Sequence, residues 1–298
     1  AMTAHALVFV ASPEDKPAYR EALLMLGRVA LNRKLPPPEV LSGWESAQWI
    51  YESVDSELRQ EAAAAVAEMP VDWALVPVEG RRKKLLVADM DSTIINVECL
   101  DELADFAGIK AEIAAITERA MRGELEFEPA LRERVGKLKG MALDALQKTY
   151  DERVRLNPGA ATFVKTMAAN GGRCVLVSGG LTFFTSRVAE AAGFHANRAN
   201  VLLDDGAALT GEVQEPILGR KAKLEAMRAE AAGLKINDKD VLAIGDGAND
   251  LDMIKAAGLG VAYHAKPLVA AEAGAKIDHT GLEAALFFQG YRRGEFVS

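Results

Sequence analysis

The chain has 298 residues, of which 50% are hydrophobic and 26% charged, and its formal net charge is −8. This length suffices for about two domains with packed cores, and the composition is that of a globular protein. The acidic balance argues against a nucleic-acid-binding protein, which usually carries a basic surface. No apolar run approaches the roughly 20 residues needed to span a bilayer, so no membrane association is expected.

Two cysteines, Cys99 and Cys174, lie far apart and form no C-x-x-C pattern. Their wide spacing predicts that both cysteines are reduced thiols, and it does not fit a disulfide framework or a zinc site. The N-terminal residues show no charged segment followed by an apolar run, the pattern of a signal peptide. Together these features predict a cytoplasmic protein.

Residues 1–80 are predicted to form a small α+β domain without a catalytic motif. A basic run, 81–84, follows and is predicted to be a solvated linker. The expected elements of the domain are strands at 7–10 and 73–78, helices at 15–26 and 61–69, and a proline break at 35–38.

Residues 81–298 have a different pattern, with three short runs that are apolar at every position: 85–88, 174–177 and 241–244. Such runs are typical of strands buried on both faces of a parallel sheet. Helical stretches at 160–169, 183–192 and 221–232 lie between them. The alternation predicts a doubly wound α/β domain, whose active site lies beyond the carboxyl ends of the strands.

Between the first two of these strands lies a long, mostly helical segment, 97–155. It is too long for a simple crossover connection. We expect an inserted cap above the active site. Its predicted helices are 101–106, 111–121, 129–139 and 143–154.

Asp89 and Asp91 follow the first apolar run, two residues apart. A carboxylate can attack phosphorus, giving an acyl phosphate that water cleaves. A second carboxyl group nearby can protonate the leaving oxygen and later accept a proton from water. Taken alone, the pair also fits a solvated turn or an acidic cation-binding loop, although the EF-hand pattern fails.

Polar residues also follow the other two apolar runs. Ser178-Gly179-Gly180 would let backbone N–H groups approach a phosphate closely, although alone it fits an ordinary turn. The segment 245–250 carries two acids and an amide, which suit an oxygen-preferring cation such as Mg²⁺. Lys223 begins the helix before that segment, and a lone lysine there is usually solvated. Their common order and position nevertheless favour phosphoryl transfer, which needs positioning and charge neutralisation.

With these motifs, the C-terminal part of the chain resembles the haloacid dehalogenase superfamily of phosphatases. The segments 89–93, 178–180 and 245–250, with Lys223, match its four motifs in order. Within that superfamily the chain resembles the phosphoserine phosphatases. The resemblance implies release of L-serine from O-phospho-L-serine, the last step of serine biosynthesis.

The resemblance extends to the predicted cap. It implies that Glu98 faces the substrate ammonium group and that Arg134 holds its carboxylate. Met121 and Phe127 would close over the substrate. Without the resemblance, Glu98 would be interpreted as a helix-start acid and Arg134 as one side of a surface ion pair. Met121 and Phe127 would be interpreted as core residues. An arginine suits a carboxylate because its planar fork can bond both oxygens.

The resemblance also implies the catalytic roles. Mg²⁺ would be bound by Asp89, by the backbone carbonyl of Asp91 and by Asp246, with Asp250 behind these ligands. Asp89 would be the nucleophile and Asp91 the general acid and base.

The substrate phosphate would be bound by residues from the remaining motifs. These are Ser178, Gly179, Gly180 and Lys223, of which Ser178, the Gly179 N–H and Lys223 would stabilise the charge on the transferring group. Asn249 would also belong to the substrate site, where it and Asp250 would orient the metal shell or Lys223.

Other functions remain open from the sequence. They are a phosphotransferase, a phosphatase for another small metabolite, and an amino-acid-binding protein without catalysis. The first domain resembles ACT-type amino-acid-sensing domains in its architecture alone. Feedback inhibition by serine, and packing or homodimer formation, are both compatible with it.

Overall fold

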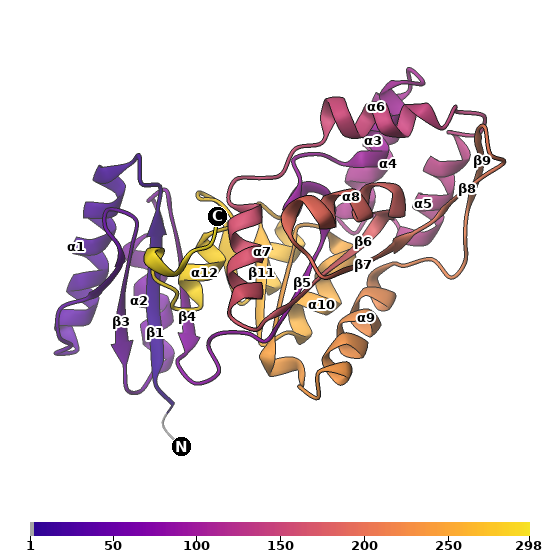
Figure 1. Cartoon of the computed structure of the whole chain (residues 1–298). Helices are drawn as coiled ribbons and strands as arrows, with labels where there is room; N and C mark the ends of the chain where they lie inside the picture. Colours follow the sequence, from indigo (N-terminus) through magenta and orange to yellow (C-terminus); the bar gives the residue numbers. More distant parts are fainter. Residues whose placement is uncertain (1–2) are drawn as a thin grey trace.

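The computed structural model describes residues 3–298 of the chain; residues 1–2 of the predicted first domain lie outside the described part. The molecule is elongated (Figure 1). A small sheet lies at one end, a parallel sheet occupies the middle, and a group of helices with a hairpin lies at the other end.

The N-terminal sheet is antiparallel, with strand order β2-β3-β1-β4. Two helices interrupt its strands, so the connectivity is βαββαβ, the ferredoxin-like arrangement. In chain order the elements are β1 (His5–Ala11), α1 (Lys16–Asn32), β2 (Glu39–Ser42), β3 (Ser46–Tyr51), α2 (Ser56–Ala65) and β4 (Val71–Pro77).

Strand β1 is buried on both faces, which explains its continuous apolar sequence. Leu7 and Phe9 pack with residues of α1 and α2 on one face. Val8 and Val10, which point to the other face, belong to the main hydrophobic core together with Phe287 of α12 (Ala284–Phe288). The small sheet therefore shares a core with the rest of the chain.

Two predictions for the N-terminal part are wrong in detail. Helix α2 is displaced toward the N-terminus from the predicted 61–69, because the Asp55 side chain caps it by accepting hydrogen bonds from Glu57 N and Leu58 N. The basic run is not simply a solvated linker. Arg81 Nε donates to Phe288 O at 2.8 Å, and burial lowers the pKa of Arg81 to about 10.

The central sheet has the strand order β12-β11-β10-β5-β6-β7, and all of its pairs are parallel. Helices α7, α8 and α12 pack on one face, and α9, α10 and α11 on the other. The predicted doubly wound α/β fold is confirmed. The bounds are β5 (Leu85–Ala88), α7 (Ala160–Ala169), β6 (Arg173–Leu181), α8 (Thr182–Ala192), β7 (Ala196–Asn200), α9 (Arg220–Gly233), β10 (Val241–Gly245), α10 (Leu251–Ala256), β11 (Leu259–Tyr263), α11 (Pro267–Glu272) and β12 (Ala275–Ile277).

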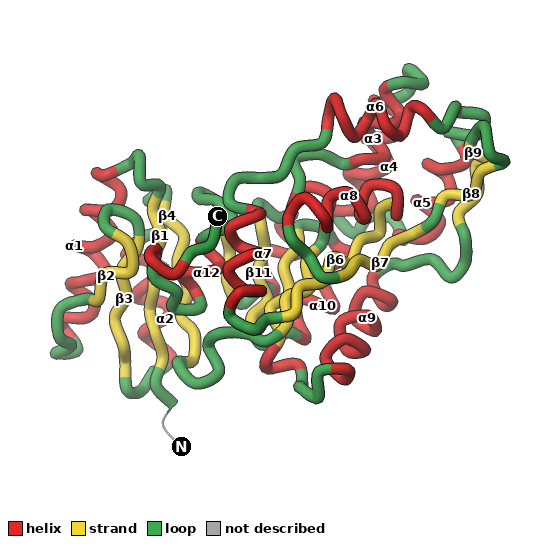
Figure 2. Tube along the Cα trace, viewed as in Figure 1, coloured by secondary structure: helices red, strands yellow, loops and turns green. Residues whose placement is uncertain are grey.

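The predicted helical insertion between β5 and β6 is present (Figure 2). A hairpin that follows β7 adds to it, because Gly140 N donates to Leu209 O and Leu209 N donates to Met141 O. The sequence did not predict this hairpin. The cap thus consists of α3 (Cys99–Asp105), α4 (Lys110–Met121), α5 (Phe127–Gly136) and α6 (Asp144–Arg153), with β8 (Leu202–Asp204) and β9 (Leu209–Val213) beside them.

Within residues 3–298, no helix is both long enough and apolar enough to cross a membrane.

Candidate active site

Three adjacent strands of the parallel sheet end at one site. Strand β5 leads into Asp89 and the short turn η1 (Met90–Ile94), β6 carries Ser178, and β10 leads into Asp246. Parallel strands place their carboxyl ends at the same edge of a sheet. Residues as far apart as Thr93 and Asp246, which are separated by 153 positions, therefore meet there.

Lys223 lies on α9, extends to this edge of the sheet and is completely buried. Its Nζ lies 2.8 Å from Asp89 Oδ1 and 2.6 Å from Asp250 Oδ1. Burial opposes the charge of the ammonium group, but the Asp250 and Asp89 carboxylates hold the pKa of Lys223 above its usual value. Lys223 is thus a buried cation in contact with the predicted nucleophile, and the solvated alternative does not apply.

Asp250 organises the loop after β10. Its Oδ2 accepts hydrogen bonds from Asp246 N at 3.1 Å and Gly247 N at 3.2 Å, while its Oδ1 accepts from Lys223. Gly245 lies so close to the Asp250 carboxyl group that a Cβ would collide with it. Because both oxygens of Asp250 already have partners, its geometry suits support of a metal shell better than direct ligation.

Asp89, Asp246 and Asp250 are buried and can each offer a carboxylate oxygen within 4.8 Å of the others. Asp246 is oriented by Thr93, whose Oγ1 donates to Asp246 Oδ1 at 3.0 Å. Burial and the Asp89 charge raise the pKa of Asp246 well above its usual value, and the same causes raise the pKa of Asp250 to about 7. Concentrated buried carboxylates of this kind fit a hard divalent cation, which would relieve their repulsion.

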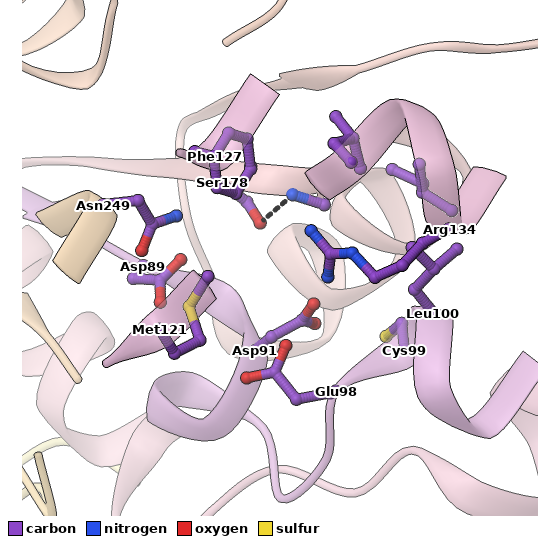
Figure 3. Close-up of a pocket in the computed structure, with 14 residues that line it drawn as sticks. Asp89, Asp91, Glu98, Cys99, Leu100, Met121, Phe127, Arg134, Ser178 and Asn249 are labelled. Atoms are coloured by element: carbon purple, nitrogen blue, oxygen red, sulfur yellow. Dashed lines mark hydrogen bonds between the residues drawn. The ribbon is translucent and has the colours of Figure 1, made fainter. Parts of the chain in front are cut away.

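The Asp91 carboxyl group is separate from this cluster and lines the neighbouring pocket with Glu98 (Figure 3). Ser92 Oγ donates to Glu98 Oε1 at 2.9 Å. Burial and the Asp89 charge raise the pKa of Asp91 to about 7, and burial raises that of Glu98 strongly. A carboxyl group with a pKa near 7 is suited to donating and accepting a proton at neutral pH.

Arg134 enters the same pocket from α5 and is 4% exposed. Its Nε donates to Ala130 O and its Nη1 to Thr117 Oγ1, both at 3.0 Å. Among the described residues, its Nη2 has no hydrogen-bond partner. A buried guanidinium nitrogen without a partner inside a pocket is a donor available to a ligand.

Met121 and Phe127 close the pocket against the sheet edge. Phe127 touches Gly179 and Gly219, and Met121 touches Gly247, so closely that a side chain at Gly179 or Gly247 would collide. The remaining cavity is about 30 Å³. This volume has room for a water molecule or two but not for an organic phosphate, so admitting one requires the cap to move.

The phosphate-cradle residues lie on the opposite wall. Ser178 Oγ accepts from Gly180 N at 2.9 Å, and Asn249 lines the pocket beside Asp89 (Figure 3). Asn200 Nδ2 donates to Gly179 O at 2.8 Å and fixes the end of β6. All the predicted site residues therefore meet at one pocket and its adjoining acidic cluster.

Sequence reasoning missed several residues of the site. Thr93 lies in the motif 89–93, four residues after Asp89, and this spacing could have marked it as a site residue. Asn157, whose Nδ2 donates to Thr93 O and Ile95 O, and Asn200 are far from the motifs in sequence. Cys99 also lines the pocket.

Comparison with known proteins agrees with this geometry. Residues 86–255 match the haloacid dehalogenase-like hydrolase family. A protein named phosphoserine phosphatase from Polaromonas sp. (strain JS666) is 47% identical over 208 residues, 68% of this chain and 88% of that protein. A haloacid dehalogenase family hydrolase from Salmonella enterica serovar Typhi superposes with a TM-score of 0.82 at 28% identity, covering 95% of this chain and 98% of that one.

A solved structure described as a phospho-aspartyl intermediate analogue of phosphoserine phosphatase is also similar. Its TM-score is 0.67 at 37% identity, and the match covers 70% of this chain and 99% of that one. The chain belongs to the haloacid dehalogenase-like hydrolases and, within them, to the phosphoserine phosphatase family.

Proposed function

We propose that this protein hydrolyses O-phospho-L-serine to L-serine and phosphate through an aspartyl-phosphate on Asp89, with Mg²⁺ as cofactor. The observation that supports this substrate is that Glu98 and Arg134 line one pocket together with Asp89 and Asp91, and that Arg134 Nη2 has no hydrogen-bond partner among residues 3–298. Phosphoserine carries an ammonium, a carboxylate and a phosphate. Glu98 can accept hydrogen bonds from the ammonium group, the Arg134 guanidinium can bond the carboxylate, and Lys223 carries positive charge beside Asp89, where the phosphate would lie.

Asp89 is the nucleophile in this proposal. Its carboxylate lies against Lys223 and would attack phosphorus in line, so that the bond from phosphorus to the serine oxygen breaks as the new P–O bond forms. Asp91 donates its proton to the departing serine oxygen. It then takes a proton from the water that cleaves the aspartyl-phosphate, which restores both carboxyl groups.

Asp89, Asp246 and the backbone carbonyl of Asp91 would hold the Mg²⁺, with Asp250 supporting them. The bound cation would supply positive charge between the nucleophile and the phosphate. Around the pocket two cationic side chains, Lys223 and Arg134, face five carboxyl groups, those of Asp89, Asp91, Glu98, Asp246 and Asp250. This excess of carboxyl groups supports a requirement for such a cation. The cation's identity as Mg²⁺ rests on the oxygen-rich donor set.

Ser178, Gly179, Gly180, Lys223 and Asn249 are proposed to bind the phosphoryl oxygens. Their donors come from the wall opposite the cap, so a phosphate held there would lie against Asp89. Closure of Met121 and Phe127 would exclude bulk water while the leaving group departs.

The test is phosphate release from O-phospho-L-serine, O-phosphothreonine, a sugar phosphate and an aryl phosphate, each with Mg²⁺ and with EDTA. Strong metal-dependent preference for phosphoserine is expected. Turnover of the aryl phosphate without turnover of phosphoserine would retain the aspartyl-phosphate chemistry and reject the substrate. Added acceptor alcohols would distinguish a phosphotransferase, because a phosphorylated alcohol would then appear among the products.

For the chain as a whole we propose a domain at 1–80, a phosphatase domain at 81–298 and a cap at 97–155. The burial of both faces of β1 supports a packing role for the first domain. Light scattering tests homodimer formation, and turnover with added serine tests feedback inhibition. A cytoplasmic location is supported by two buried free thiols, Cys99 and Cys174.

A further inference from the structure

The direction of the Arg134 guanidinium is set by groups outside the pocket. An arginine side chain has several rotatable bonds and holds one geometry only where its nitrogens are anchored. The Nε of Arg134 is bound to Ala130 O in its own helix. This contact fixes the stem, while rotation that would move Nη2 is limited by the second contact, from Nη1 to Thr117 Oγ1.

The Thr117 hydroxyl has a defined direction. Because Arg134 only donates, Thr117 Oγ1 must accept from it and give its single hydrogen elsewhere. Two acceptors are in range: Asp101 Oδ1 at 2.5 Å and Ile113 O at 3.1 Å. The shorter contact, to a carboxylate, is the stronger one. A chain of hydrogen bonds therefore runs from Arg134, which donates to Thr117, to Asp101, which accepts from Thr117.

The three residues of this chain come from three helices of the cap: Arg134 from α5, Thr117 from α4 and Asp101 from α3. Asp101 and Thr117 are 9% and 3% exposed. Among the described residues, Thr117 supplies the side-chain hydrogen bond to Asp101. The neighbouring acid, Glu102, instead pairs with Lys110 and Arg153.

We infer that Asp101 and Thr117 are positioning residues that hold Arg134 at the place of the substrate carboxylate. The inference rests on the proposed function and deepens it. Glu98, the residue proposed for the ammonium group, immediately precedes α3, and Asp101 lies in the first turn of that helix. The chain thereby ties Arg134 to the element that carries Glu98, and so sets the spacing between the two groups that recognise an α-amino acid.

The variant Thr117→Val removes the hydroxyl but keeps the shape, and Thr117→Ser keeps the hydroxyl. Asp101→Asn removes the charge behind it. The assay compares kcat and KM for O-phospho-L-serine and for O-phosphoethanolamine, which has the ammonium group but no carboxylate. Thr149→Val is the matched control, because Thr149 is another buried cap threonine, bonded to Ala145 O.

Thr117→Val should lower kcat/KM for phosphoserine by about 10- to 100-fold, mainly through KM, the effect of losing a hydrogen bond to a charged group. Phosphoethanolamine turnover should change little. Thr117→Ser should recover most of the loss, Asp101→Asn should behave like Thr117→Val with a smaller effect, and Thr149→Val should resemble wild type on both substrates.

Equal losses on the two substrates, or no loss in Thr117→Val, would overturn the positioning role while the proposed function stands. If the wild-type protein itself did not prefer phosphoserine over phosphoethanolamine, the proposed function would fail and the inference with it. Thermal unfolding of each variant shows whether an equal loss on both substrates comes from misfolding, because a misfolded variant melts at a lower temperature than the wild type.

Discussion

Asp72, on β4, joins the N-terminal sheet to the phosphatase core. The side chain is 3% exposed. It accepts hydrogen bonds from Asp278 N at 2.8 Å, His279 N at 3.2 Å, Thr280 N at 2.9 Å and Thr280 Oγ1 at 2.6 Å. These donors belong to the loop between β12 and α12, so replacing Asp72 by alanine removes the acceptor for four donors at once.

The expected loss of stability is smaller than four separate hydrogen bonds would suggest. Each hydrogen bond to a charged group is worth about 1.5–3 kcal/mol in isolation, and such values do not add. Residues 278 and 279 are exposed and residue 280 is partly exposed, so water can satisfy some of the freed donors. We therefore expect Asp72→Ala to lower the free energy of unfolding by about 2–4 kcal/mol, or the melting temperature by roughly 4–16 °C.

The assay is thermal and urea unfolding followed by circular dichroism, with Asp205→Ala as control. Asp205 also accepts two backbone hydrogen bonds, from Ala207 N and Ala208 N, but its turn is exposed. The control should change stability by less than about 1 kcal/mol. If Asp72→Ala melted at the same temperature as the control, the contact would contribute nothing to docking of the two sheets. The packing role proposed for the first domain would then rest on apolar burial alone.

Three further predictions concern the active site, each measured by steady-state kinetics with Mg²⁺ present. Asp89→Asn should abolish turnover because an amide is a poor nucleophile; retention of more than about a tenth of the activity would reject the assignment. Asp91→Asn should lower kcat by roughly 10²- to 10⁴-fold through loss of proton transfer, and an unchanged kcat would remove its acid–base role. Arg134→Ala should reduce kcat/KM for phosphoserine by about 10²-fold or more, and that for an aryl phosphate far less; equal reductions would exclude contact with the carboxylate.

The parts of the fold that could be predicted are those with a strong local pattern. The runs 85–88 and 241–244 are apolar at every position, because both faces of the central strands are covered by helices. Strands β2 and β3 were not predicted from the sequence, because β2 has only four residues and β3 mixes polar with apolar residues. The β8–β9 hairpin was missed for the same reason, since its strands lie at the rim of the cap and bury few side chains.

The site shows the same division. Asp89 and Asp246 could be found because each directly follows a buried strand, and Asp91 because it lies two residues after Asp89. Thr117 and Asn200 have no such marker, since their partners are brought to them by packing of elements far apart in the chain. The basic run 81–84, which includes Arg81, was predicted to be a solvated linker because it directly precedes an apolar run. The contact of Arg81 with Phe288 O spans 207 positions and follows only from how the C-terminal helix docks.

In the proposed function, the sheet-edge wall of the pocket carries out the reaction and the cap wall selects the substrate. The sheet edge contributes Asp89, Asp91, Ser178 and Lys223. In the proposed function these residues act on the phosphoryl group, whatever it is attached to. In the same proposal Arg134 on the cap and the adjoining Glu98 bind the carboxylate and the ammonium group of the substrate. A change of substrate would therefore require changes on the cap and at α3, with the sheet edge left intact. For this reason an active but unselective variant is expected from cap substitutions, whereas sheet-edge substitutions should lower turnover of every phosphate ester together.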